Sequence, residues 1–402
     1  MKVVMVSNYL NHHQIPFCRA MCGETEGDFR FIQTEPMEEE RLGMGWREEA
    51  PPYRKLSYEE PRECARLILE SDVVIFGGCE EESYLAERLK SRRPVMRYSE
   101  RLYKSGQWKA ATPRGLLRKY LDHTRYRKAP VCLLCAGAYV PSDFHIIRAY
   151  PGKMYRWGYF PETRSYDIAA LMEQKEKATP SLLWAGRFLD WKHPELPLRA
   201  ARRLKETGLD FHLDLLGGGA LEPMVRTLTA QYGLERQVTL QGCKTPEEVR
   251  SFMEKADVFL LTSDRREGWG AVVNEAMNSG CAIAANHMAG AVPFLIRHGE
   301  NGLIYQDGNE EQLFALTGQL VRDAAFRKRL GTQAYRTITE EWNAETAAAN
   351  LMALFRELEW LEPPSGGKAA PARIAERAPG SPAPVVSERR MLTFLAGEGG
   401  RP

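Results

Sequence analysis

Val258-Phe259-Leu260-Leu261 is a short apolar run, and the stretch Glu267-Gly268-Trp269-Gly270-Ala271-Val272-Val273-Asn274-Glu275 follows it. The run is typical of a buried parallel strand. Gly268 and Gly270 predict a turn into a helix, and Gly280 predicts where that helix ends. The first glutamate therefore lies in a loop and the second within a helix, in the strand–turn–helix unit of doubly wound sheets.

The same alternation of short apolar runs and amphipathic segments continues along most of the chain. It implies right-handed crossovers and parallel sheets, so we expect an α/β protein with two doubly wound, Rossmann-like domains. The predicted strands of the first domain are Val3–Val6, Phe29–Gln33, Val73–Phe76, Val95–Tyr98 and Val131–Leu134. Those of the second are Leu182–Ala185, His212–Leu216, Val238–Gln241, Val258–Leu261, Cys281–Ala285 and Gly302–Tyr305.

Local signals place the domain boundaries. Met154 to about Ser181 is interpreted as the interdomain connection, which gives domains at 1–164 and 165–343. Thr245-Pro246-Glu247-Glu248 predicts a capped helix start, and Gly208 and Gly233 predict two helix ends. Residues 344–361 predict a final helix, whereas the Pro-, Ala-, Gly- and Ser-rich composition of 362–402 predicts a disordered tail.

Composition narrows the class of protein. The chain has 402 residues, 44% hydrophobic and 27% charged, which is typical of a soluble globular protein. Its 55 basic and 53 acidic residues give no global case for nucleic-acid binding. The apolar start is too short for a signal peptide and no segment approaches the roughly 20 apolar residues of a spanning helix, so we expect a cytoplasmic protein. Cys132 and Cys135 have metal-type spacing but lie in a predicted strand without a second pair, which favours core packing.

Glu267 and Glu275 flank a turn with the chemistry that a sugar nucleotide needs. A diphosphate prefers backbone N–H groups and a positive helix end, while sugar and ribose hydroxyls prefer carboxylate acceptors. A simpler interpretation stays open, in which Glu267 is a favourable charge at a helix amino end and Glu275 is a solvated position.

The stretch resembles the signature of the retaining glycosyltransferases of family four, also called glycosyl transferases group 1, and the chain is most similar to a bacterial polysaccharide-type subset. The resemblance implies a GT-B architecture, in which two Rossmann-like domains face a cleft and the helix at 344–361 returns to the first domain. It implies that Glu267 positions the transferred sugar, without acting as a nucleophile, and that Glu275 binds the ribose. The backbone that would hold sugar and diphosphate is that of Gly268, Trp269, Gly270, Ala271 and Val272.

Two cations follow the first predicted strand of the second domain, which ends in Gly186-Arg187, with Lys192 five residues later. Ligands of doubly wound domains bind at the carboxyl ends of strands. Arg187 and Lys192 could neutralise the diphosphate as it leaves, and the resembled family has a Gly-Arg and a Lys here. Two cations on a solvated loop are the alternative.

Two further turns resemble donor-binding positions of the family. Gly217 and Gly218 follow a predicted strand, where glycines would let backbone approach a ligand, although the run is not a dinucleotide fingerprint because its sixth position is Glu222. The Gly242-Cys243-Lys244 turn matches the place where relatives hold the edge of the base, and a simple loop is an equal alternative there.

The turn after the first predicted strand resembles an Asn-His-His-Gln run of the polysaccharide-type subset. The resemblance implies that Asn8, His12, His13 and Gln14 contact acceptor or donor sugar. A His-His pair is also compatible with a metal site or a helix cap. The run has no nearby acidic partner and the chain has no Asp-x-Asp, so we expect neither a metal nor another cofactor.

Residues 104–128 are strongly basic and carry interleaved aromatic and leucine side chains. They contain eight Lys or Arg residues and one acid, Asp122, in a chain whose net charge is +2. Such a segment can dock on an anionic membrane or a lipid-linked acceptor. A solvated helix is an equal alternative.

Taken with these features, the resemblance implies a retaining glycosyltransferase of hexosyl type. It would take a UDP- or GDP-sugar and deliver the sugar to a glycan or lipid-linked saccharide, in the cytoplasm or peripherally on the inner membrane face. A GT-B sugar-nucleotide epimerase or hydrolase would share the nucleotide site without needing an acceptor. A non-catalytic GT-B subunit is the other alternative, and the intact set Glu267, Glu275, Arg187 and Lys192 argues against it.

Overall fold

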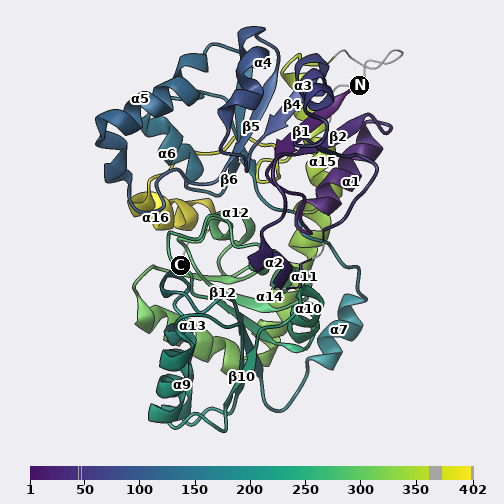
Figure 1. Cartoon of the computed structure of the whole chain (residues 1–402). Helices are drawn as coiled ribbons and strands as arrows, with labels where there is room; N and C mark the ends of the chain where they lie inside the picture. The colour runs from purple at the N-terminus through teal and green to yellow at the C-terminus, as the bar shows by residue number, and fades with distance from the viewer. Residues whose placement is uncertain (44, 47, 362–373, 400–402) are drawn as a thin grey trace. The chain divides into compact units, whose positions relative to one another are not determined.

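The structure is a computed structural model that describes residues 1–43, 45, 46, 48–361 and 374–399. It divides the chain into two compact units. The N-terminal unit comprises Met1–Glu162 and Trp342–Ser387, and the C-terminal unit comprises Thr163–Glu341 and the stretch from Glu388 onward. Each unit is built around one parallel sheet with helices packed on it (Figure 1). The division after Glu162 lies two residues from the expected boundary at 164.

The N-terminal sheet has seven strands in the order β3-β2-β1-β4-β5-β6-β7. In chain order they are β1 (Val3–Ser7), β2 (Phe29–Gln33), β3 (Arg54–Leu56), β4 (Val73–Phe76), β5 (Val95–Ser99), β6 (Val131–Ala136) and β7 (Met154–Trp157). The interior strand β1 pairs in parallel with β2 and β4, so that Val3 lies opposite both Phe29 and Val73. Its five residues are all buried, which explains its continuous apolar run.

Helices and short helical turns connect these strands. They are α1 (Ile15–Glu24), α2 (Glu39–Gly43), α3 (Pro61–Glu70), η1 (Glu82–Leu85), α4 (Ala86–Lys90), η2 (Gln107–Ala111), α5 (Pro113–Asp122), η3 (Thr124–Tyr126), α6 (Val140–Ile146) and, from the far end of the chain, α15 (Ala344–Glu357). Helix α15 packs against α1, so it belongs to the N-terminal unit, as the family resemblance implies. Cys132 and Cys135 are buried in β6, where the sequence places them in the core.

The C-terminal sheet has six strands in the order β10-β9-β8-β11-β12-β13. They are β8 (Ser181–Ala185), β9 (His212–Leu216), β10 (Val238–Gly242), β11 (Val258–Leu261), β12 (Ala282–Asn286) and β13 (Leu303–Tyr305). The helical elements are α7 (Ile168–Gln174), η4 (Asp190–Lys192), α8 (Glu195–Glu206), α9 (Glu222–Gln231), α10 (Pro246–Lys255), α11 (Val272–Asn278), α12 (Val292–Leu295), α13 (Glu310–Arg322), α14 (Ala324–Arg336), η5 (Thr337–Glu341) and α16 (Glu388–Gly399).

The helix signals of the C-terminal unit are confirmed. Thr245 and Glu248 form a reciprocal capping box at the start of α10. Gly208 and Gly233 adopt positive φ just past the ends of α8 and α9, where a residue without Cβ is least strained.

Two strands of the N-terminal sheet have no counterpart in the sequence prediction. β3 is a three-residue edge strand whose residues are all half-buried, so it lacks an apolar run. Met154–Trp157 lies within the stretch interpreted as interdomain connection, yet it forms β7 and pairs with β6. Its Arg156 is buried and interrupts the apolar pattern that would have revealed it.

The expected disordered tail also differs from the structure over part of its length. Residues 362–373 lie outside the described residues. Beyond them, Gly380 donates to the carbonyl of Arg156 at 2.8 Å and Ala383 to that of Met154 at 2.9 Å, so this segment lies along the open edge of β7. Backbone pairing at a sheet edge needs no apolar side chains, so composition does not predict it. The helix α16 follows.

Candidate functional site

Three neighbouring strands of the C-terminal sheet, β10, β9 and β8, end in glycine turns that contact one another. The N–H of Gly186, after β8, donates to the carbonyl of Leu216 at 3.0 Å. The N–H of Gly217, after β9, donates to the carbonyl of Gly242 at 2.9 Å. The structure thus brings three predicted donor-site turns to one end of the sheet, where doubly wound folds bind ligands.

The glycines of these turns are needed because the turns lie so close together. Gly217 has φ +132°, and a Cβ there would lie 1.9 Å from the carbonyl oxygen of Gly186. A Cβ on Gly218 would lie 3.0 Å from the thiol sulfur of Cys243. Gly217 therefore lets one loop approach the next. That these glycines also admit a ligand stays a prediction. Cys243 itself is exposed, and Lys244 beside it is half-buried.

Lys192 and Glu267 form an ion pair at the same end of the sheet. Lys192 comes from η4 after β8, and Glu267 from the loop after β11, which is the strand next to β8. The two side chains are only 16% and 11% exposed, and the Lys192 ammonium also lies 4.5 Å from the centre of the Trp191 ring. Arg187 follows Gly186 in the same loop and is half-buried. The fold thus brings a cation and a carboxylate that are 75 positions apart in the chain into direct contact.

A buried network fixes the two loops that carry this pair. Thr262, which directly follows β11, donates its hydroxyl to the carbonyl of Lys192 at 2.7 Å and accepts from the indole N–H of Trp184 at 2.8 Å. The N–H of Asp264 donates to the carbonyl of Trp191 at 2.9 Å. These bonds hold the backbone of both loops, so the ion pair is preorganised.

His193 is a charged residue of this site that the sequence interpretation missed. Its Nδ1 lies 2.9 Å from a carboxylate oxygen of Glu195, and its Nε2 lies 3.5 Å from Asp264. Hydrogen bonds to Asp264 and Glu195 raise the pKa of His193 to about 9, so the imidazolium is charged at neutral pH. The sequence held no clear signal for this residue, because Glu195 only begins a helix and the fold alone brings Asp264 to His193.

The turn before α11 is anchored by a buried side chain. Trp269 is buried and donates its indole N–H to the side chain of Asn274 at 2.9 Å, so its ring packs in the protein interior. Gly270 has φ +95°, as the predicted turn requires. Ala271 and Val272, at the start of α11, are half-buried, which leaves backbone of this turn near the surface.

Glu275 lies one turn into α11 and is half-buried. Burial raises the pKa of its carboxyl group to about 7, while the positive charges of Arg250 and Arg164 act in the opposite direction. A carboxyl group perturbed in this way is typical of a functional site, and it does not fit the simpler interpretation of a solvated position.

In the N-terminal unit, the predicted Asn-His-His-Gln run forms the loop between β1 and α1. Gln14 is buried, donates to the Ser7 hydroxyl at 3.3 Å and accepts from the Asn11 side chain at 3.1 Å, so it ties the loop together. The carbonyl of Asn8 accepts from Thr34 at 2.8 Å. Both residues therefore have structural roles within this unit.

The two histidines of that loop are aromatic neighbours. The rings of His12 and His13 lie 3.9 Å apart, and His12 packs edge-on to Trp46 at 4.4 Å. Burial and the nearby charge of Arg41 lower the pKa of His12 to about 4, and burial lowers that of His13 as well. Both imidazoles are therefore neutral at pH 7.

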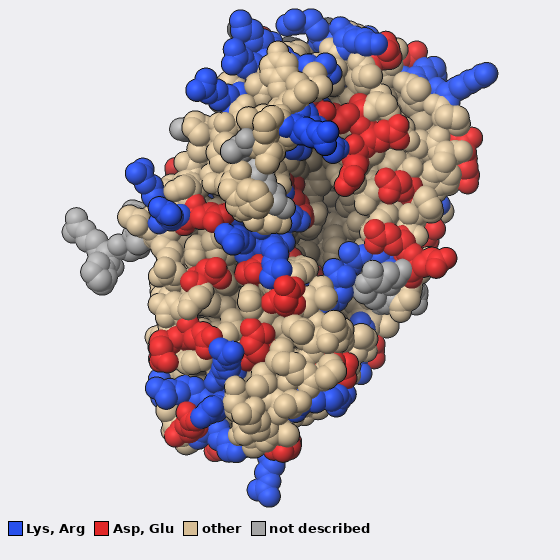
Figure 2. Space-filling view, turned by 60° about the vertical axis from the view of Figure 1, so that its left-hand side comes forward, with Lys and Arg blue, Asp and Glu red and all other residues tan. Residues whose placement is uncertain are grey.

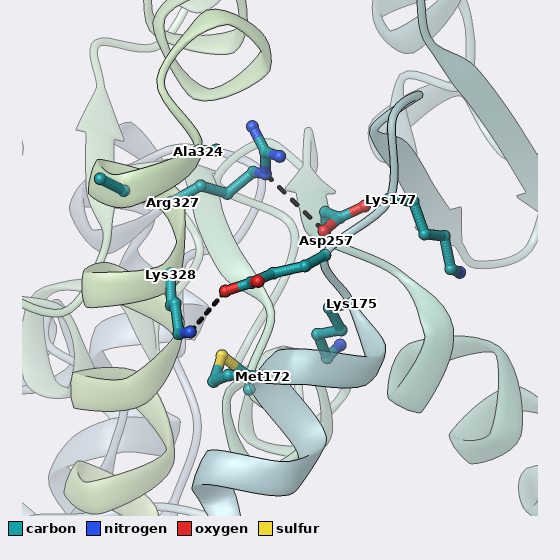
Figure 3. Close-up of a pocket in the computed structure, with 10 residues that line it drawn as sticks. Met172, Lys175, Lys177, Asp257, Ala324, Arg327 and Lys328 are labelled. Carbon is teal, nitrogen blue, oxygen red and sulfur yellow. Dashed lines mark hydrogen bonds and ion pairs between the residues drawn. The ribbon is translucent and has the colours of Figure 1, made fainter.

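A cavity of about 450 Å³ lies at the opposite end of the C-terminal sheet from the Lys192–Glu267 pair (Figure 3). Asp257, just before β11, accepts from the N–H of Ser181 at 2.8 Å and pairs with Arg327. Lys175 is buried and donates to the carbonyl of Met253 at 2.8 Å, and Lys328 pairs with Glu176. These lining charges join α7, α10 and α14, which favours a structural role over a ligand site.

Comparison with solved structures defines the fold. The chain resembles the crystal structure of HepE from Anabaena in complex with UDP, with a TM-score of 0.66 at 14% identity, covering 89% of this chain and 100% of that one. Two Rossmann-like units of this kind make up a GT-B fold. Residues 170–337, which lie in the C-terminal unit, match the family described as glycosyl transferases group 1.

Two relatives match a comparable share of the chain. The putative colanic acid biosynthesis glycosyltransferase WcaL of Salmonella typhimurium is 27% identical over 183 residues, which is 44% of this chain and 45% of WcaL. The amylovoran biosynthesis glycosyltransferase AmsK of Erwinia amylovora is 27% identical over 208 residues, half of each chain. The chain thus matches about half the length of each of these relatives.

Among the described residues, no helix combines the length and apolar character needed to cross a membrane.

Proposed function

We propose that this protein is a retaining glycosyltransferase that takes a sugar from a UDP- or GDP-sugar and transfers it to a glycan or lipid-linked saccharide. The observation that carries the proposal is the Lys192–Glu267 pair, held at the carboxyl end of β8 and β11 beside three closely packed glycine turns. A cation for the diphosphate and a carboxylate for sugar hydroxyls are the two groups that a sugar nucleotide requires at one place.

We assign a separate role to each of these groups. Lys192, with Arg187 from the same loop, stabilises the negative charge that grows on the diphosphate as the bond to the sugar breaks. Glu267 accepts hydrogen bonds from the sugar, and Glu275 accepts from the ribose. Because Glu267 is paired with Lys192, we assign it to sugar positioning and not to nucleophilic attack. The acceptor hydroxyl then attacks from the face that the diphosphate leaves, and the departing diphosphate oxygen takes its proton.

The comparisons support the donor and the pathway. HepE is described in complex with UDP, WcaL as a putative glycosyltransferase of colanic acid biosynthesis, and AmsK as a glycosyltransferase of amylovoran biosynthesis. We extend both properties to this chain, with Asn8, His12, His13 and Gln14 in the N-terminal unit as the acceptor side. We also propose that fixed protein cations replace a metal, so that activity survives EDTA. Loss of activity in EDTA with rescue by manganese would contradict this part.

The first experiment is a thermal-shift screen with UDP, GDP and their sugars. A ligand at 100 times its Kd stabilises the folded protein by about 2.7 kcal/mol, a shift of several degrees. Glu275→Ala should weaken the shift, whereas Glu235→Ala, which removes an exposed carboxylate from the turn after α9, should not. Equal shifts in wild type and both variants would remove Glu275 from the donor site.

Product analysis separates the rival activities. Transfer requires an acceptor, whereas a hydrolase releases free sugar and nucleotide without one and an epimerase returns an altered donor. A protein that binds donor but shows none of these reactions would be a non-catalytic subunit.

A further inference from the structure

Helix α5 in the N-terminal unit has the reverse of the usual surface-helix pattern. A surface helix normally buries an apolar stripe and exposes its polar face. No residue of α5 is buried, and its half-buried positions are Gly115, Lys119 and Asp122. The polar side of α5 therefore faces the protein, and Figure 1 shows the helix at the periphery of this unit.

The outward side of α5 is apolar. Four of its large side chains follow the three- and four-residue spacing of one helix face, and the preceding η2 adds a tryptophan. Their exposed fractions are 69% for Trp108, 44% for Leu116, 61% for Leu117, 53% for Tyr120 and 41% for Leu121. These five are close to half of the eleven large apolar side chains that are exposed anywhere in the described residues. An apolar cluster of this kind marks an interaction surface.

Basic residues border the apolar face. Arg114 and Arg118 are exposed on α5, and Arg125, Arg127 and Lys128 are exposed just after it. Figure 2 shows Lys and Arg side chains gathered at the top of the view, over the N-terminal unit. The nearest acid, Asp122, pairs with Arg118 at 3.6 Å, so the segment retains an excess of positive charge.

We propose that this apolar face, with its basic border, docks on an anionic lipid bilayer, with the leucines in the acyl boundary and Trp108 and Tyr120 at the headgroup level. The combination selects a membrane over a protein partner, because leucine and aromatic side chains enter the interface while Lys and Arg meet anionic headgroups. The inference does not depend on the donor site, which lies in the other unit.

The test uses the full-length protein and sedimentation with vesicles of phosphatidylcholine alone or mixed equally with phosphatidylglycerol. The wild type should bind the mixed vesicles at low salt and dissociate as salt rises. Each basic residue near an anionic surface strengthens binding about fivefold, so Arg114→Glu/Arg118→Glu should weaken it by at least about 25-fold. Arg62→Glu/Arg66→Glu on α3 has the same spacing and charge change in the same unit, and should bind like the wild type.

A second pair of variants tests the apolar face. Leu117→Gln/Tyr120→Gln should also lose binding, whereas Leu69→Gln, at a 39% exposed position of α3, should not. Brominated acyl chains should quench the tryptophan fluorescence of the wild type more than that of Trp108→Phe. None of these side chains is buried, so the variants should keep the wild-type Tm and nucleotide affinity, which separates failure here from failure of the donor site.

Three results would overturn the proposal. They are a wild type that ignores anionic vesicles at low salt, apolar-face variants that bind like the wild type, and a wild-type dimer that dissociates in Leu117→Gln/Tyr120→Gln. The last would make this face an interface between copies of the chain.

Discussion

Replacing Lys192 by alanine tests the reasoning about the donor site most directly. The ammonium pairs with Glu267, and both side chains are nearly buried, so the substitution removes the cation that pairs with that carboxylate. Loss of a charge-assisted hydrogen bond costs about 1.5–3 kcal/mol, so we expect UDP affinity to fall about 10- to 150-fold. The fold should survive, because Thr262 bonds the backbone carbonyl of residue 192 and not its side chain.

The assay is titration calorimetry of UDP and of a UDP-sugar with Lys192→Ala, Glu267→Gln, the double variant and a control. If the two groups act as a pair, their effects on UDP-sugar affinity should be non-additive by about 0.5–3 kcal/mol. The control is Lys177→Ala, which removes an exposed lysine from the cavity at the opposite end of the sheet and should leave affinity unchanged. Loss of affinity in Lys177→Ala but not in Lys192→Ala would move the donor site to that cavity and refute our assignment.

Three further outcomes are expected. Glu267→Gln should keep affinity for free UDP but lower the transfer rate, since the carboxylate is assigned to the sugar; equal loss of UDP affinity in calorimetry would assign it to the nucleotide. Because the pKa of His193 is raised to about 9 in the folded protein, its charge stabilises the fold fully below the unfolded pKa near 6.5, and this stability is lost as pH rises through about 9. In urea unfolding, the free energy of unfolding of the wild type should therefore exceed that of His193→Asn by about 1–2 kcal/mol at pH 6, and the two should be equal at pH 10. A Cβ at position 331 would lie 2.2 Å from the carbonyl oxygen of Gly280, so Gly331→Ala should lower Tm. Gly318→Ala on α13 is the control and should not lower Tm, because the nearest atoms there belong to a flexible arginine.

Where the side-chain pattern was regular, the sequence sufficed for the fold. Eleven strands were predicted from apolar runs, because a parallel strand covered on both faces must be apolar throughout. β3 escaped prediction because its residues are only half-buried, and β7 because the buried Arg156 interrupts its apolar pattern. The edge strands β10 and β13 have apolar runs and were predicted, whereas the segment at 380–383 escaped because it pairs through its backbone. Fold class was accessible from local chemistry, and strands without an apolar run were not.

The candidate site shows the same division. The sequence alone singled out Glu267 and Lys192, because a carboxylate beside a glycine turn and a cation after a strand are local features. Only the tertiary structure decided that these two side chains pair with each other, that Asp264 charges His193, and that Gly217 serves the contact between loops. The physical reason is that strand order, which places β8 beside β11, is set by packing across the whole sheet and leaves no trace in any single segment.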